Sequence, residues 1–191
     1  METELNQYLI KAKELWSKKN YKESLDCALN GANKGHIESQ VFVGWLYLKG
    51  EKDIERNLEE SIKWLKIAAK SGSSSGHYLL GISYYYLLNY DEALAEFISA
   101  SKLNYFAADY QIGKMYYFGI GVQKDIEKSY QYFLTAKKQG HLFARRQVAI
   151  ILMKGHKGFL NIMKGVFLFL TLFINGFIVA LKEPDSEKLY E

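Results

Sequence analysis

Small and apolar residues recur along the chain at helical spacing. An aliphatic residue precedes a glycine or alanine at four places, namely Val43 and Gly44, Leu80 and Gly81, Ile112 and Gly113, and Val148 and Ala149. In the first three copies an aromatic residue follows the glycine by three positions, and in all four a small residue precedes the aliphatic one by four. Spacings of three and four place side chains on one face of a helix. Each copy is therefore predicted to be a helix that a neighbouring helix can approach closely.

A second helix is predicted after each of these helices. In residues 57–72 the large Trp64 lies between Ser61 and Ala68 at helical spacing, and residues 125–140 repeat the arrangement. The glycine that closes each segment is suited to a left-handed C-cap. One helix pair cannot bury its apolar face alone, whereas stacked pairs can. The pattern therefore predicts an all-α protein, an α-solenoid of helix–turn–helix repeats.

Residues 108–140 resemble the Sel-one-like repeat, a relative of the tetratricopeptide repeat. The resemblance rests on Ala108, Ile112, Gly113, Tyr116, Gly119, Gly121, Val122, Asp125, Lys128, Ser129, Tyr132, Ala136 and Gly140. Residues 39–72 are similar with a longer loop, residues 76–104 are closer to the tetratricopeptide form, and residues 5–35 resemble a degenerate first unit. The resemblance implies a right-handed superhelix that presents a concave surface to protein partners.

The repeats suggest a division of the chain into a repeat domain and a C-terminal extension. The repeat domain is expected over residues 1–158, with units at about 5–35, 36–72, 73–104 and 105–140 and a partial unit at 141–158. A hydrophobic helix is expected at 159–181 and a polar tail at 182–191.

Residues 165–181 contain no charged side chain, and their polar side chains are Thr171 and Asn175. A stretch of about 17–25 apolar residues is long enough to cross the hydrocarbon core of a bilayer. We therefore predict a transmembrane helix at 159–181, with a helix covered by the solenoid or by a partner as the alternative. The residues expected to face lipid are Val166, Phe167, Phe169, Leu170, Phe173, Ile174, Phe177 and Ile178.

Charge is uneven along the chain, whose formal net charge is +4. Residues 141–165 carry five basic residues and no acid, whereas residues 182–191 carry two bases and four acids. The positive-inside rule then places the repeats on the cytoplasmic side of the membrane, and the same bases would attract anionic head groups. Because the excess charge is local, a nucleic-acid-binding surface along the chain is not expected.

The residues that usually carry chemistry do not form a recognisable site. The Gly119 to Gly121 turn lacks the strand and the Lys-Ser/Thr of a phosphate-binding loop. The four histidines each follow a glycine and do not converge as metal ligands would. The single cysteine, Cys27, lies on an apolar helical face and has no histidine or acid at a diagnostic spacing. We expect no catalytic centre, no metal, no cofactor and no small-molecule substrate.

Aromatic residues occupy the first-helix positions that face the concave surface in the tetratricopeptide-like frame. Three columns of such positions are Leu9, Val41, Tyr78, Tyr110 and Arg146; Lys13, Trp45, Ile82, Lys114 and Ile150; and Trp16, Leu48, Tyr85 and Tyr117. Aromatic side chains commonly anchor interfaces, although tyrosine is also common between packed helices. The residues predicted to bind a partner are Trp16, Trp45, Tyr78, Tyr85, Tyr110, Lys114, Tyr117 and Arg146.

These features together predict a non-enzymatic scaffold or adaptor that binds a protein or peptide and is tethered to a membrane by residues 159–181. Two alternatives remain. One is a subunit of a larger membrane complex in envelope biogenesis, polysaccharide assembly or secretion, and the other is a binding inhibitor of the immunity type.

Overall fold

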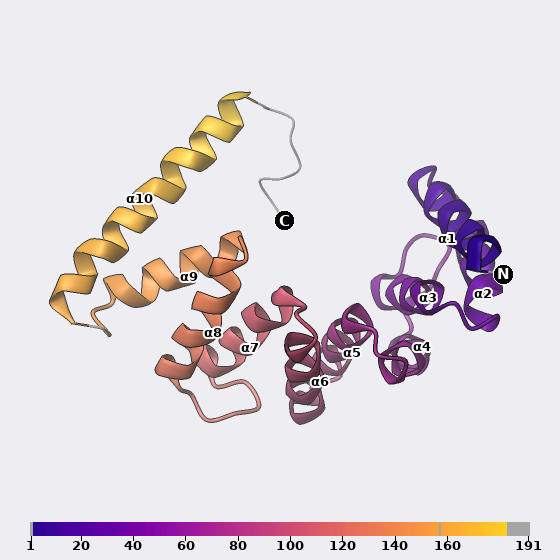
Figure 1. The fold of residues 1–191 in the computed structure, drawn as a ribbon, viewed down its shortest axis with the longest axis horizontal. Coiled ribbons are helices and arrows are strands. Elements are labelled where there is room, and N and C mark those ends of the chain that lie inside the picture. Colours follow the sequence, from indigo (N-terminus) through magenta and orange to yellow (C-terminus); the bar gives the residue numbers. More distant parts are fainter. Residues whose placement is uncertain (1, 157, 183–191) are drawn as a thin grey trace. The chain divides into compact units, whose positions relative to one another are not determined.

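The computed structural model describes the backbone of residues 2–156 and 158–182, with side chains described for 4–156, 158 and 160–174. Within these residues the chain forms ten α-helices and no β-strand beyond an isolated bridge between Glu51 and Ile54 (Figure 1). The helices are α1 (Glu2–Ser17), α2 (Tyr21–Asn33), α3 (Ile37–Lys49), α4 (Leu58–Lys70), α5 (Ser74–Tyr86), α6 (Tyr90–Lys102), α7 (Phe106–Phe118), α8 (Ile126–Lys138), α9 (Leu142–Met153) and α10 (Phe159–Lys182). The prediction of an all-α helical-repeat fold is confirmed.

Helix ends follow the turn residues of the sequence. The side chains of Asn57 and Asp125 accept hydrogen bonds from backbone N–H groups three residues on, at 3.0 and 2.9 Å, and so cap α4 and α8. Gly72 and Gly140 close these two helices with φ values of +85° and +86°. Only glycine adopts such angles without strain, so the predicted left-handed C-caps are confirmed.

Close packing of the pairs α3–α4, α5–α6 and α7–α8 depends on a glycine in the first helix, namely Gly44, Gly81 and Gly113. A Cβ atom at Gly81 would lie 2.7 Å from the ring of Phe97, and one at Gly113 would lie 2.7 Å from the ring of Phe133. Both phenylalanine side chains are fully buried. The glycine column recognised in the sequence therefore provides the space into which the second helix inserts a large, fully buried side chain.

The chain divides into two compact units, Met1–Ala108 and Asp109–Glu191. The first contains the pairs α1–α2, α3–α4 and α5–α6, and part of its core is a cluster around Ala28, Val43 and Leu46. The second contains α8 to α10 and most of α7, with a core cluster around Phe133, Val148 and Ile151.

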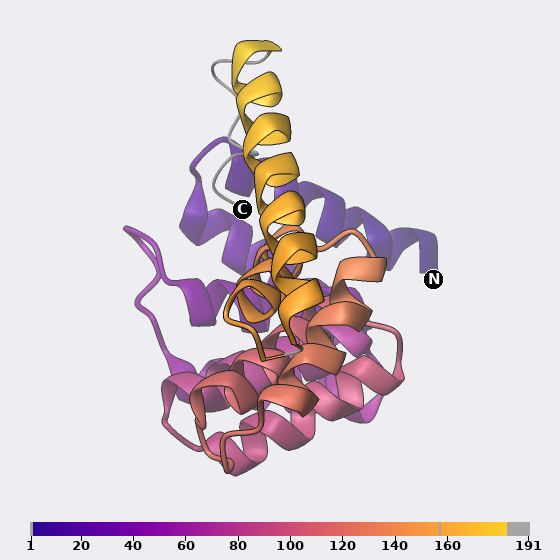
Figure 2. The same cartoon turned by 90° about the vertical axis from the view of Figure 1, so that its left-hand side faces the viewer.

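The predicted hydrophobic helix forms α10, which packs against α9. Figures 1 and 2 show it as one long helix (yellow) that meets α9 and extends beyond it. In the part of the chain that the structure describes, none of the helices has the length and hydrophobicity that a membrane crossing requires. The side chains of Phe177 and Ile178 lie outside the described residues, and the membrane-crossing segment stays a prediction.

Candidate functional site

A groove runs along the first helices of the N-terminal unit. One part of it, of about 480 Å³, lies among α1, α3 and α5. A second part, of about 370 Å³, continues between α3 and α5. Both parts are lined by Trp45, Tyr78 and Leu79, so they form one continuous surface. This surface is called the aromatic groove below.

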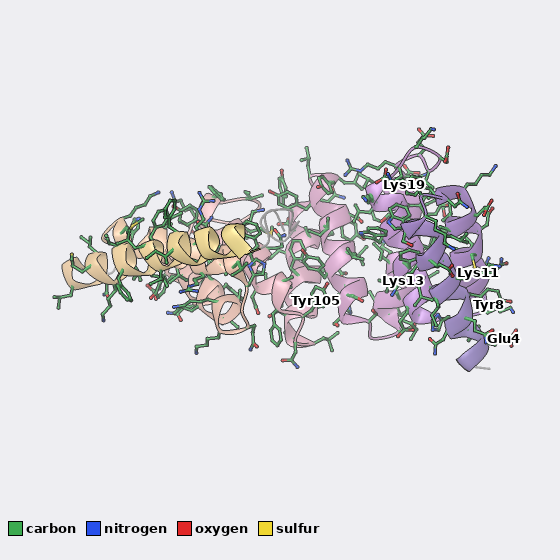
Figure 3. The ribbon with its side chains drawn as sticks, turned by 90° about the horizontal axis from the view of Figure 1, so that it is seen from above. Glu4, Tyr8, Lys11, Lys13, Lys19 and Tyr105 are labelled. Atoms are coloured by element: carbon green, nitrogen blue, oxygen red, sulfur yellow. The ribbon has the colours of Figure 1, made fainter. Side chains whose placement is uncertain are left out.

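Helical spacing brings residues from three repeats together in this groove. Leu9, Lys13, Val41, Trp45, Tyr78, Ile82 and Leu48 from the predicted concave columns all line it. Lys13 of α1 and Tyr105, which follows α6, are labelled in Figure 3. The first helices are neighbours because α1 contacts α3 and α3 contacts α5. Equivalent helical positions therefore fall side by side.

The floor of the groove is built from aromatic rings in contact. The ring of Trp45 stacks on Phe42 at a centroid distance of 5.5 Å and meets Trp16 edge-on at 4.9 Å. The ring of Tyr78 lies 4.8 Å from that of Tyr105. Burial, together with the neighbouring Tyr78, raises the pKa of the Tyr105 hydroxyl. These ring contacts make up much of the apolar surface of the groove.

The rim of the groove is mainly basic. The Lys49 ammonium lies 4.9 Å from the centroid of Trp16 and is 2.9 Å from the Glu51 carboxylate. The Arg56 guanidinium lies 4.3 Å from the centroid of Tyr86. With Lys13 these residues supply three cations, whereas the acid lining the groove, Glu38, is 3.1 Å from Nε2 of His36. The residues that line the groove therefore include more basic than acidic side chains.

The other predicted partner-binding residues have different roles. Tyr85 packs edge-on against Tyr90 at 5.3 Å, within the α5–α6 pair. Trp16 is not among the residues that line the groove, and its ring contacts Trp45 at 4.9 Å and Tyr21 at 4.7 Å. Both side chains are half-buried, as expected for aromatic residues that pack between helices and do not contact a partner.

Four predicted residues lie in the C-terminal unit. Tyr110 stacks on His141 at 4.4 Å, and Lys114 lies 5.8 Å from the Tyr110 ring, where burial lowers the pKa of its ammonium. Tyr117 packs against the core of this unit and accepts a hydrogen bond of 2.9 Å from Lys154. Arg146 is exposed on α9.

Sequence reasoning missed several groove residues, namely Phe42, Tyr105, Lys49, Arg56 and Tyr86. Arg56 reaches the groove from the long loop between α3 and α4, and Tyr105 from the turn after α6. A frame based on helix positions does not place loop residues. Phe42 follows Val41 directly, so a wider helical face would have included it.

A second depression, of about 570 Å³, lies between α1 and α2 and includes Glu4, Tyr8 and Lys11 (Figure 3). Cys27 also lines it, donates its S–H to the carbonyl of Tyr8 at 3.4 Å, and has a pKa raised by burial. A raised pKa disfavours the nucleophilic thiolate. Among the described residues no group of three or more His, Cys, Asp or Glu side chains is arranged to hold a metal ion.

Comparison with known proteins identifies the repeats. Residues 37–73 and 107–141 match the sequence model of the Sel1 repeat. These two matches cover α3–α4 and α7–α8 with their connecting loops, which contain Gly50 in the first pair and Gly119 and Gly121 in the second.

Solved structures show the same fold. A protective antigen of uropathogenic Escherichia coli strains with an SLR fold matches 69% of this chain at 27% identity and a TM-score of 0.64. A Sel1 repeat protein from Oxalobacter formigenes matches 88% of the chain at 23% identity and a TM-score of 0.74, and the match covers 68% of that protein. A putative Sel1 repeat protein from Klebsiella pneumoniae matches 98% of the chain at 17% identity and a TM-score of 0.61, and the match covers 93% of that protein.

The match to the Escherichia coli antigen covers 29% of that protein's own length. These likenesses show that the chain is an all-α helical-repeat solenoid with the fold of Sel1 repeat proteins. Proteins built from Sel1 repeats act as protein-interaction scaffolds, and the fold is generally non-catalytic.

Proposed function

We propose that this chain is a scaffold that binds an extended, acidic peptide segment of a protein partner in the aromatic groove of its N-terminal unit. The observation that carries the proposal is the continuous surface around Trp45 and Tyr78, shared by three successive repeats. The groove is open and passes over residues of three repeats. A peptide in an extended conformation could therefore contact all three repeats at once. Aromatic anchors would provide contact area, and the basic rim would select acidic residues and accelerate association.

We also propose that residues 159–181 hold the scaffold at a membrane, with the repeats on the cytoplasmic side. The basic residues of 141–165 would be attracted to the anionic lipids of a cytoplasmic leaflet, and the exposed apolar side chains of α10 would contact its acyl layer. A partner captured in the groove would then be concentrated at that membrane.

The groove is tested by peptide selection followed by matched substitutions. The purified full chain in mild detergent would select binders from a displayed library of random peptides, and affinity for one selected peptide would then be measured by fluorescence anisotropy. Trp45→Ala and Tyr78→Ala should each weaken binding by about tenfold or more, as expected for buried aromatic anchors. Circular dichroism should show unchanged helicity.

The control for these variants is Tyr8→Ala. Tyr8 is a half-buried aromatic residue of the α1–α2 depression, outside the aromatic groove. It should leave the peptide affinity unchanged within about twofold, a difference below the scale of an interface anchor. Equal losses in all three variants, loss of helicity in Trp45→Ala and Tyr78→Ala, or a selected peptide without acidic residues would contradict the proposal.

A further inference from the structure

Helix α10 exposes a stripe of large apolar side chains. Leu160, Met163, Phe167, Leu170, Phe173 and Ile174 are between 53% and 79% exposed. They are spaced by three or four residues, apart from the adjacent Phe173 and Ile174, and therefore lie along one side of the helix. Monomeric soluble proteins rarely leave a continuous apolar patch of this kind in water. The stripe therefore indicates a surface that is covered either by lipid or by another protein surface.

The opposite side of α10 is already docked on α9. A Cβ atom at Gly165 would lie 2.7 Å from the backbone nitrogen of Met153, so the two helices are in backbone contact there. Leu168 packs against the core of the C-terminal unit. Arg145 of α9 donates a hydrogen bond of 3.1 Å to the hydroxyl of Thr171. These contacts fix which side of α10 faces outward.

The charges near the stripe indicate which kind of surface binds it. Residues 128–182 contain no Asp or Glu, and five bases fall within residues 141–165. Lys164 is exposed on α10, and Thr171, which binds Arg145, lies two turns further along the same side of the helix. Two cations therefore border one edge of the stripe. A second copy of the chain would bring like charges together, whereas an anionic lipid surface offers opposite charge beside an apolar layer.

The position of Arg145 decides the orientation of the helix. Helix α10 has 24 residues, and Thr171 lies near its middle. If α10 crossed a bilayer while docked on α9, the Arg145 guanidinium would lie near the bilayer centre, where a charged side chain is strongly disfavoured. If α10 lies flat, the same guanidinium remains at the level of the phosphates.

We propose that α10, docked on α9, lies in the plane of an anionic phospholipid surface. Its apolar stripe enters the outer part of the acyl layer, and Arg145 and Lys164 contact the phosphates. This inference rests on the proposed membrane attachment and specifies its mode, which is a helix bound at the surface that does not cross the bilayer.

The first experiment measures co-sedimentation of the full chain with vesicles. Phosphatidylcholine vesicles containing phosphatidylglycerol should bind the chain at least about tenfold more strongly than pure phosphatidylcholine, and added salt should weaken the binding. Phe167→Asp should reduce binding by about tenfold or more, because an aspartate would replace an exposed ring that enters the acyl layer on binding. The matched control is Ile10→Asp, which replaces an apolar side chain of α1 that is 65% exposed and should bind as the unmodified chain does.

The second experiment distinguishes a surface-bound helix from a crossing one. In a Cys27→Ser background, Ser186→Cys places a thiol in the tail, and Ser17→Cys places one at the end of α1 as a control. The chain is added to preformed vesicles, followed by a maleimide that cannot cross membranes. Both thiols should react equally fast with and without vesicles. Protection of the thiol introduced by Ser186→Cys until detergent is added would overturn the surface-bound mode while preserving membrane attachment.

Other outcomes overturn the proposal in different ways. Equal binding to neutral and anionic vesicles would exclude recognition of anionic lipid. Absence of binding to both would exclude the membrane attachment itself. Peptide binding in the aromatic groove would still be tested separately, by Trp45→Ala and Tyr78→Ala. A dimer in sedimentation equilibrium that Phe167→Asp dissociates, without vesicle binding, would identify a second copy as the partner of the stripe.

Discussion

Histidine 141 links a helix cap to the core of the C-terminal unit. Its Nδ1 accepts a hydrogen bond of 3.2 Å from the backbone N–H of Ala144, and its ring stacks on Tyr110. Accepting this bond requires an unprotonated Nδ1. Burial lowers the pKa of this imidazole from its ordinary value of 6.5. The neutral form is therefore the one that caps α9.

Protonation of His141 should make stability depend on pH. Because the folded-state pKa is lowered, the unfolded chain takes up the proton first as pH falls. The contribution of His141 is therefore complete above the unfolded-state pKa of about 6.5 and is lost progressively below it. Urea unfolding of the full chain in mild detergent between pH 8 and pH 5 should show this loss.

The comparison for this prediction is His141→Asn. Asparagine also caps helices but does not titrate, so the variant should lose less stability over the same pH range. Parallel stability curves for the two proteins would contradict the assigned role.

Single residues also show what the sequence allows one to predict. The glycines at 44, 81 and 113 were recognised as sites of close helix approach, and the structure adds the side chains that fill them, such as Phe133 against Gly113. The glycine is visible because its spacing repeats. The side chain that fills the space lies on another helix about 20 residues away, and pairing across helices does not follow from periodicity within one helix.

Helix boundaries were predictable where capping residues mark them. Residues 57–72 and 125–140 were expected to be helical, and α4 and α8 occupy Leu58–Lys70 and Ile126–Lys138. Asn57 and Asp125 at one end and Gly72 and Gly140 at the other define these limits physically. The α5–α6 turn lacks glycine, and Leu88 adopts a φ of +64° there instead.

Helix α10 was harder to predict because hydropathy does not distinguish lipid from protein contact. Its spacing also fits the repeat, since Gly165 follows Ser129 by 36 residues, as Gly113 precedes Ala149 by 36. The packing of α10 on α9 resembles that of a second helix on its first. Because apolar residues occur on all sides of α10, the sequence did not show which side docks on α9. In the structure the docked side includes the partly buried Ile162, Leu168 and Leu172.

Docking of α10 should fail when Gly165 carries a large side chain. Gly165→Leu would place atoms against the backbone of Met153 and Ala149, which cannot move aside as a flexible side chain would. We expect a cost of about 1–3 kcal/mol for the α9–α10 contact. Hydrogen–deuterium exchange should rise in α9 and α10 and remain unchanged in α1 to α6.

The control is Lys164→Leu, which adds the same side chain at the adjacent exposed position of α10. It should leave exchange in α9 unchanged. If both variants behaved alike, added hydrophobicity and not overpacking would be the cause.

At the scale of the whole molecule, the functional features are distributed over two compact units. The N-terminal unit carries the aromatic groove, and the C-terminal unit carries the apolar stripe of α10. The groove columns were predictable within one unit because repeats translate equivalent positions along the solenoid. The roles of Arg56 and Tyr105 depend on loops, whose course the repeat frame does not specify.

The most direct test of the peptide-binding groove is to locate a bound peptide by photo-cross-linking. A benzophenone amino acid would replace either Lys13, which lines the aromatic groove, or Gln7, which lines the α1–α2 depression. Both positions are exposed on α1, so neither substitution should disturb the fold. With a peptide selected by the unmodified chain, irradiation should give a covalent adduct at position 13 and none at position 7. An adduct at position 7, or at neither position while the peptide remains bound, would contradict the assignment of the groove as the binding site.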